Sequence, residues 1–193
     1  MARPPRFDTD QLLDAAVRLA ASGGPAGVTM SAVAQAVGAP SGSMYHRFPG
    51  RTALLAEVWL RTVERFQEGY LAVLTGEADP HRAARAASRY VVAWCRENPD
   101  EATLLLYGAA DFDRAHWSEE HSRRSDTGNN QVLAALLRLG EALGARDEQA
   151  RDRVALALVD LPLTVVRRHL RAGTALPPHA EDLTEQCTTA LLA

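Results

Sequence analysis

The 193-residue sequence contains no lysine, only two cysteines and few aromatic residues. All 21 basic residues are arginine, and aromatic residues make up 6% of the chain. Cys95 and Cys187 lie far apart on helical patterns, so we interpret them as reduced, small apolar residues of a cytoplasmic protein. There is no run of 18 apolar residues and no signal peptide, which predicts a protein that has no membrane partner.

Acidic residues are absent from one segment, residues 28–55, which contains two arginines and one histidine. The net charge of the whole chain is −3, but residues 1–56 contain five arginines against three aspartates and carry +2, which leaves −5 on residues 57–193. This division favours an anionic partner at the N-terminal segment and disfavours indiscriminate binding of that partner elsewhere.

The same segment has the pattern of two short helices joined by a tight turn. Thr29 is a candidate N-cap for the first helix. An apolar stripe at i, i+3, i+4 and i+7 follows it, formed by Met30, Val33, Ala34 and Val37. Gly38 stands where a left-handed residue ends a helix, Pro40 cannot continue that helix, and Ser41 can cap the next one.

The second helix of the segment is predicted to span about two turns, because Pro49 disfavours the helical conformation at Phe48. Met44 and Phe48 are four residues apart and are expected to pack inward. The residues between and beside them, Ser43, Tyr45, His46 and Arg47, are left to point outward or sideways. A new amphipathic helix is expected from Arg51.

This arrangement suits DNA, because a short helix placed by a turn can enter the major groove. Small residues allow close approach to phosphates, tyrosine and histidine can contact phosphates or base edges, and arginines supply charge. The candidate DNA-binding residues are Thr29, Ser31, Ser41, Gly42, Ser43, Tyr45, His46, Arg47 and Arg51. The alternative is a helical hairpin inside an unrelated all-α domain, since two-helix spacing alone is common.

The residue pattern resembles the signature of the TetR family of bacterial transcriptional regulators. The matching run is Gly38-x-x-x-Gly42-Ser43-Met44-Tyr45-His46-Arg47-Phe48-Pro49-x-Arg51-x-x-Leu54-Leu55. The family's usual form is a Gly, a short turn, Gly-Thr-Leu-Tyr-x-x-Phe, a basic residue and a Leu-Leu pair. The resemblance is specific over residues 8–60. Many members have Ser-Lys where this chain has Pro40-Ser41, so a phosphate-binding lysine is missing here.

The resemblance implies an all-α fold of about nine helices. Its DNA-binding domain would be a three-helix helix-turn-helix domain at residues 1–50, and a helical bundle at residues 51–193 would bind an effector and form the dimer. The periodicity of the chain agrees with this fold, since it contains helical patterns and no β alternation. We expect helices from Thr9, then over 29–37, 42–48, 51–74 and 81–97, near 104–107, and over 127–143, 147–172 and 179–192.

The N-terminal arm, Ala2–Arg6, is interpreted either as a solvated tail or as a segment that reaches phosphates or the minor groove. Asp8 starts a capping box for the first helix, which is expected to support the helix-turn-helix through Leu12, Ala16 and Leu19.

The last two long helices carry apolar stripes, formed by Val154, Leu158, Leu161 and Val165 and by Leu183, Cys187 and Leu191. Such stripes can be intrachain core. In the resembling family, however, these helices pair with those of a second copy as a four-helix bundle. A homodimer would place two reading heads about 34–36 Å apart, one turn of DNA. Pro162 is expected to kink the longer helix or to begin it afresh.

A ligand pocket is implied by the resemblance more than by the residues themselves. Its candidates are Phe66, Tyr70, Tyr90, Trp94, Tyr107, Phe112 and Trp117, and an ordinary core would need such residues too. Arg89 and Arg96 flank Trp94 and could meet an acidic ligand, although solvated arginines fit the pattern better.

Asp113, His116 and Glu120 have a one-face spacing that a metal could use, but the composition suits an exposed loop, and we expect no metal and no cofactor. We also expect no catalytic residue, since the sequence lacks a nucleophile elbow and a phosphate loop.

The sequence thus predicts a cytoplasmic regulator, a homodimer that binds double-stranded operator DNA as a repressor and releases it when a small-molecule effector binds. The alternative is a DNA-binding regulator without such a switch. An all-α enzyme fits the sequence poorly.

Overall fold

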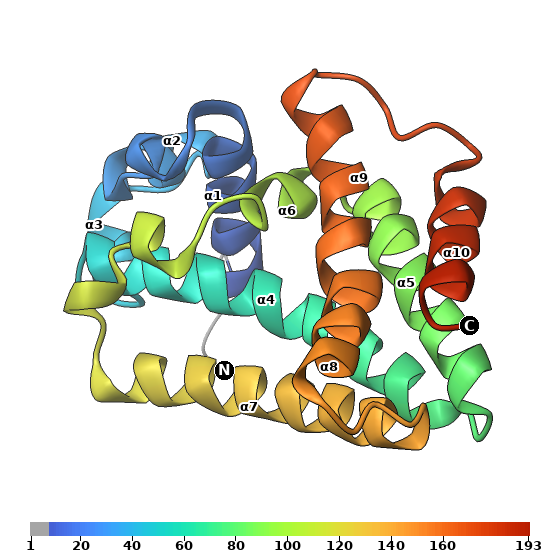
Figure 1. Ribbon diagram of the computed structural model, residues 1–193. Helices are drawn as coiled ribbons and strands as arrows, with labels where there is room; N and C mark the ends of the chain where they lie inside the picture. The colour runs from blue at the N-terminus through green and yellow to red at the C-terminus, as the bar shows by residue number, and fades with distance from the viewer. Residues whose placement is uncertain (1–7) are drawn as a thin grey trace, which may run out of the picture. The chain divides into compact units, whose positions relative to one another are not determined.

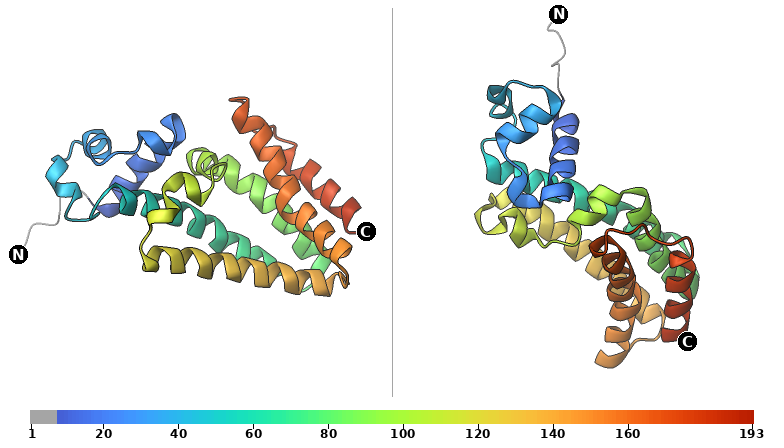
Figure 2. Two further views of the ribbon diagram at one scale, coloured as in Figure 1. Left: turned by 60° about the vertical axis from the view of Figure 1, so that its left-hand side comes forward. Right: turned by 90° about the horizontal axis from the view of Figure 1, so that it is seen from above.

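The computed structural model describes residues 8–193, and within that range the chain is helical and has no strand (Figures 1 and 2). The α-helices are α1 (Thr9–Gly23), α2 (Met30–Val37), α3 (Ser41–Met44), α4 (Arg51–Gly76), α5 (Pro80–Glu97), α6 (Pro99–Leu104), α7 (Glu119–Ala142), α8 (Glu148–Ala155), α9 (Leu161–Arg171) and α10 (Ala180–Leu191). One turn of π-helix, Leu156–Asp160, which we call the π turn, joins α8 to α9 without a break. If α8, the π turn and α9 are counted as one continuous helix, the α8–α9 rod, the described range contains nine helices besides short 3₁₀ turns, which confirms the predicted fold class.

The chain forms two compact units. Unit 1 contains the described residues up to Val63 together with Thr103–Ser125, and unit 2 contains Glu64–Ala102 and Asp126–Ala193. Helices α4 and α7 each contribute residues to both units. The division into a DNA-binding and an effector domain at residue 50 is a functional one and stays a prediction.

Helices α1 and α2 begin at the caps that the sequence singles out, and α2 ends at the predicted glycine. Asp8 caps α1 by accepting a hydrogen bond from the Gln11 amide at 2.7 Å, and Thr29 caps α2 by accepting one from the Ala32 amide at 3.1 Å. Gly38 ends α2 in the left-handed region, with φ of 69°, which an L side chain rarely adopts.

Three local expectations were wrong. Helix α3 spans a single turn rather than two, because the chain leaves the helix after Met44 and continues as a turn over residues 45–47, although the Phe48 amide still donates to the Met44 carbonyl at 2.9 Å. Pro40, not Ser41, occupies the cap position of α3 and makes no side-chain cap bond. Helix α7 begins at Glu119 rather than near Thr127, because the Ser118 hydroxyl accepts the His121 amide at 3.2 Å as an N-cap does.

The core of unit 1 contains aromatic residues from distant parts of the chain. Trp59 of α4 packs on Phe112 with ring centroids 5.0 Å apart, and Tyr107 meets Phe112 edge-on at 6.3 Å. The Trp117 indole N–H donates to the Phe112 carbonyl at 2.8 Å. Leu12, Ala16, Met44 and Phe48 are buried in the same core, as expected. Val33, Leu54, Leu55 and Val58 are buried in it too, and Leu19 and Val37 pack against it while partly buried. Residues 103–125 therefore complete the core that supports the helix-turn-helix.

Unit 2 holds its helices together with both apolar and polar contacts. Helices α5 and α10 lie side by side (Figure 1), and arginines of α5 bind acidic residues of α10. Arg89 contacts Asp182 at 2.5 Å and Glu185 at 2.9 Å, and Arg96 contacts Glu181 at 2.6 Å.

Pro162 explains the π turn and the hydroxyl groups buried around it. Proline has no N–H, so the Leu158 carbonyl, four residues earlier, cannot receive an α-helical bond, and the Ala157 carbonyl cannot receive a π-helical one. The Tyr70 hydroxyl donates to the Leu158 carbonyl at 2.8 Å, and the Thr188 hydroxyl donates to the Ala157 carbonyl at 3.2 Å. Both orphaned acceptors are thereby satisfied.

Candidate nucleic-acid interface

Helices α2 and α3 and the turn between them form the candidate interface in unit 1. Their inward side is apolar, since Val33 and Met44 are fully buried and Phe48 is nearly so. Their outward side is polar or small, and Val28–Arg51 includes no acidic residue. This segment is therefore fixed by its buried face while its other face stays available to a partner.

Two predicted contacts, Tyr45 and His46, follow α3 and have exposed side chains. Tyr45 is 61% exposed, the highest value among the exposed large apolar and aromatic residues in the described range. His46 next to it is also exposed. Because neither belongs to the buried core, both could meet bases or phosphates without disturbing it.

The hydroxyl residues of the segment are partly used in local bonds. The Thr29 hydroxyl caps α2 and lies 3.2 Å from the Ser31 hydroxyl, which is exposed. The Ser43 hydroxyl donates to the Pro40 carbonyl at 2.7 Å. Gly42 is exposed. The side chain of Ser41 and the whole arm Ala2–Arg6 lie outside what the structure describes.

The two arginines of the segment are bound to backbone carbonyls. Arg47 is partly buried and its Nη1 lies 3.5 Å from the Ser43 carbonyl. Arg51 donates from Nε to the Val28 carbonyl and from Nη2 to the Pro25 carbonyl, both at 2.8 Å. Sequence reasoning missed the Arg51 bonds, because nothing in the spacing of residues 25, 28 and 51 signals that they meet.

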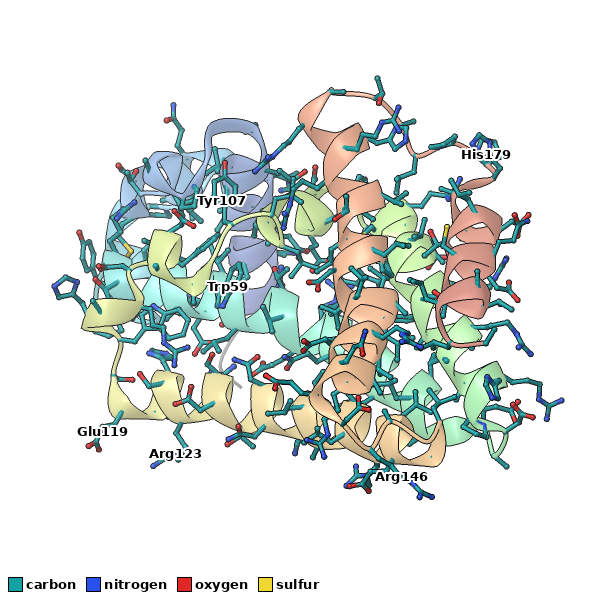
Figure 3. The ribbon with its side chains drawn as sticks, viewed as in Figure 1. Trp59, Tyr107, Glu119, Arg123, Arg146 and His179 are labelled. Atoms are coloured by element: carbon teal, nitrogen blue, oxygen red, sulfur yellow. The ribbon has the colours of Figure 1, made fainter. Side chains whose placement is uncertain are left out.

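The seven predicted pocket residues fall into two sets. Tyr107, Phe112 and Trp117 belong to the core of unit 1, together with Trp59, which was not among the predicted candidates; Trp59 and Tyr107 are labelled in Figure 3. Phe66, Tyr70, Tyr90 and Trp94 cluster in unit 2, where Phe66 stacks on Tyr70 at 5.6 Å and meets Trp94 edge-on at 5.3 Å. The structure thus gathers four of the seven candidates in one cluster of unit 2 and places the other three in the core of unit 1.

Both tyrosine hydroxyls of the unit 2 cluster are engaged with backbone. Tyr70 is bound to Leu158, and burial raises its pKa above the usual range. Tyr90 packs over Gly69, where a Cβ would collide with it, and donates to the Phe66 carbonyl at 3.1 Å. Burial raises the pKa of Tyr90 to about 12. The cluster therefore offers apolar faces rather than charged or free polar groups.

Arg89 and Arg96 both bind acidic residues of α10, while their side chains stay 41% and 33% exposed. In addition to Glu181, Arg96 contacts the carbonyls of Leu176 and Pro177, at 3.3 and 3.0 Å. These arginines fasten α10 to α5.

Two of the three possible metal ligands, Asp113 and His116, pair with each other. The Asp113 carboxylate accepts from the Thr52 hydroxyl at 2.6 Å and pairs with His116 at 2.5 Å. The Thr52 bond, followed by the His116 bond, holds the pKa of the Asp113 carboxyl below its usual range. In the described part of the chain, no group of three His, Cys, Asp or Glu side chains is arranged to hold a metal ion.

The predicted dimer stripes divide into buried and exposed residues. Val154 and Leu158 are buried in the core of unit 2, whereas Leu161, Val165, Cys187 and Leu191 are partly exposed. Leu156 and Leu183 are 44% and 46% exposed. No helix within residues 8–193 is long and apolar enough to cross a membrane.

Residues 12–58 match the model of the bacterial regulatory proteins of the tetR family. The fold is similar to that of the TetR family transcriptional regulator PfmR from Thermus thermophilus, with 21% identity, a TM-score of 0.69 and 97% of each chain covered. It is also similar to the transcriptional regulator FadR from Bacillus subtilis in complex with stearoyl-CoA, with 14% identity, a TM-score of 0.73, and 96% of this chain and 98% of that chain covered.

A third similar structure is the fatty acid degradation regulator FadR from Bacillus halodurans, with 17% identity and a TM-score of 0.67 over 96% of this chain and 98% of that chain. No curated protein matches the sequence.

Proposed function

We propose that this chain, which belongs to the TetR family by its N-terminal region and its fold, is a homodimeric transcriptional repressor whose operator binding is controlled by a small molecule. The observation that carries the proposal is the segment from Thr29 to Phe48. Its caps and buried face fix it in unit 1, and it presents Tyr45 and His46 on a segment that contains no acidic residue. Such a protein works on DNA in the cytoplasm and needs no catalytic residue.

The DNA contacts that we propose come from α2, α3 and the turn after α3. Tyr45 and His46 are the candidates for base edges, and Arg47 and the small residues Ser31, Gly42 and Ser43 are candidates for phosphates, with Thr29 and Ser41 beside them. Because it has so few cations, a single DNA-binding domain binds weakly. In a dimer, two such domains related by a twofold axis contact the two halves of a palindromic site, and their contacts add.

The proposed dimer uses the α8–α9 rod and α10. Leu156 and Leu183 are large apolar residues about half exposed, and partly exposed apolar residues continue both stripes. A second copy of the same surface would remove them from water.

The effector that we propose has an apolar or aromatic portion, because the cluster of Phe66, Tyr70, Tyr90 and Trp94 offers ring faces and has its hydroxyls engaged. The similar structure from Bacillus subtilis is in complex with stearoyl-CoA, which contains a long apolar chain, and supports this class of ligand. The effector acts by binding the DNA-free state more tightly than the DNA-bound state.

A regulator without a small-molecule switch is the second candidate. The close mutual packing of the four aromatic residues is also what an ordinary core requires. The two candidates differ in whether any apolar ligand lowers operator affinity.

Binding of full-length protein to DNA from upstream of its own gene tests the proposal, against random DNA and over a series of salt concentrations. We expect the upstream fragment to outcompete random DNA, and Tyr45→Ala to weaken that binding about tenfold or more. Arg146→Ala is the matched control, because Arg146 is exposed in unit 2 (Figure 3) and its loss should leave DNA binding unchanged.

The operator hypothesis fails if the upstream fragment never outcompetes random DNA at any salt concentration. A Tyr45→Ala variant that loses its helical circular dichroism would mean that Tyr45 supports the fold instead. The effector arm of the experiment adds acyl-CoA thioesters of increasing chain length. No change in operator affinity with any of them would favour the second candidate.

A further inference from the structure

Arg51 joins two segments of unit 1 that are far apart in sequence. Its guanidinium makes two hydrogen bonds of equal length, from Nε to the Val28 carbonyl and from Nη2 to the Pro25 carbonyl. Val28 is the residue before the Thr29 cap, and its side chain is fully buried. Arg51 therefore binds the backbone at the point where the chain turns into α2.

Helix preferences do not explain an arginine at this position. Arg51 is the first residue of α4, and a cation at a helix N-terminus opposes the helix dipole. The two carbonyls offset that cost, since a hydrogen bond from a charged donor is stronger than one between neutral groups. A planar guanidinium holds its donors in a fixed fork on separate nitrogen atoms, which matches these two carbonyls, whereas the three donors of lysine share one nitrogen atom at the end of a flexible stem.

The bonds constrain the direction in which α2 leaves the preceding loop. The Pro25 carbonyl also accepts the Val28 amide at 3.2 Å, so Pro25, Val28 and Arg51 form one closed set of contacts. The next residue of α4, Thr52, donates to Asp113. The first turn of α4 thus fixes both the start of α2 and the segment after α6.

We propose that Arg51 is a positioning residue for DNA binding, which sets the angle of α2 and hence of α3 through the Pro25 and Val28 carbonyls, rather than a phosphate contact. This inference rests on the proposed function, since it concerns how the same DNA-binding surface is held. It predicts that operator binding needs the forked geometry of the arginine side chain, and that a positive charge at position 51 is not enough.

The experiment compares Arg51→Lys, Arg51→Gln and the control Arg61→Lys in the full chain. Arg61 is a matched control because it lies on the same helix and also joins distant segments, through Asp14 at 2.7 Å, but it binds α1 rather than the start of α2. Affinity for the operator fragment and for random DNA is measured by fluorescence anisotropy over a salt series, and folding by circular dichroism. Amide NMR shifts of residues 28–32 report the position of the start of α2.

We expect Arg51→Lys and Arg51→Gln to lose operator affinity about equally, by tenfold or more, while Arg61→Lys binds as the wild type does. Arg51→Lys should keep the wild-type dependence on salt and its affinity for random DNA, because its charge is unchanged. The amide shifts of residues 28–32 should move in both Arg51 variants and stay in place in Arg61→Lys.

Three results would overturn the proposal. In the first, Arg51→Lys binds with wild-type affinity, and in Arg51→Gln the slope of log affinity against log salt falls by about 1.8 for the dimer. That pair of results would assign Arg51 to one phosphate contact in each DNA-binding domain. An equal loss in Arg61→Lys, or loss of helical signal in Arg51→Lys, would assign it a general role in stability. Failure of the wild type itself to prefer its upstream DNA would instead refute the proposed function.

Discussion

The two units are stabilised in different ways. Unit 1 buries aromatic rings that come from α4 and from residues 103–125, so its core depends on a segment far along the chain from the helix-turn-helix. Unit 2 has an apolar core too. Ion pairs join helices in both units, between α1 and α4 in unit 1 and between α5 and α10 in unit 2, but in unit 2 hydroxyls buried around Pro162 also connect the helices.

This difference has a consequence for function. The surface proposed to bind DNA is formed by local motifs, but the core beneath it includes residues outside the region that matches the family model. In unit 2, polar bonds to the backbone decide how the π turn is accommodated. Changes in the core of unit 1 should therefore loosen the DNA-binding surface, and changes to buried hydroxyls should loosen unit 2.

The largest effect is expected from Trp117→Ala. Trp117 is 8% exposed and its indole donates to the Phe112 carbonyl, so the change removes a large ring from the core and leaves an acceptor without its donor. We expect unit 1 to lose about 3–5 kcal/mol of unfolding free energy. Relative to the wild type, the rate of amide hydrogen exchange should increase more in residues 12–20 of α1 than in residues 83–95 of α5.

Arg123→Ala is the control for that change, because Arg123 is exposed on α7 and points away from the helix into solvent (Figure 3). Equal loss of protection in α1 and α5 would contradict the separation of the two units, and a loss below about 1 kcal/mol would contradict the role of Trp117 in the core.

A smaller effect is expected from Tyr70→Phe in unit 2. The change leaves the Leu158 carbonyl buried without the donor that replaces the missing N–H of Pro162, at a cost of about 1–3 kcal/mol. Tyr90→Phe is the matched control, because the Phe66 carbonyl that Tyr90 contacts lies inside α4 and keeps its helical donor. Urea unfolding of the two variants measures the difference. If both variants lose the same unfolding free energy, the missing N–H of Pro162 does not make the Tyr70 hydrogen bond more important than that of Tyr90.

Local motifs made much of the N-terminal region predictable. Asp8, Thr29 and Gly38 act through the few residues next to them, so the ends of α1 and α2 could be derived from the sequence. The length of α3 could not be derived in this way, because a turn over residues 45–47 places Met44 and Phe48 inward just as a second helical turn would. The Ser118-Glu119-Glu120 start of α7 was a readable cap signal that the polar character of the segment obscured.

Contacts between distant segments could not be predicted in the same way. The Arg51 bonds to Pro25 and Val28 and the Tyr70 bond to Leu158 depend on the tertiary fold, and periodicity carries no information about them. Periodicity also cannot separate core aromatics from ligand-binding aromatics, so the seven pocket candidates were treated as one set although they divide between the two units. The proposed contacts of Tyr45 and His46 with DNA stay a prediction.

The smallest effect concerns acid stability of unit 1 through Asp113. The Thr52 hydroxyl and His116 hold the pKa of the Asp113 carboxyl below its value in the unfolded chain, which is about 3.9. A carboxyl with a lowered folded-state pKa stabilises the fold above its unfolded pKa, and that contribution disappears as the pH falls through the folded-state pKa. Asp113→Asn should therefore unfold with a weaker dependence on pH than the wild type between about pH 5 and pH 2. Thermal unfolding at a series of pH values measures this, with Asp152→Asn, an exposed aspartate of α8, as the control. Parallel curves for wild type and Asp113→Asn would show that the contacts of Asp113 do not favour its charged form, and the junction between the first turn of α4 and residue 113 would then be stabilised by packing alone.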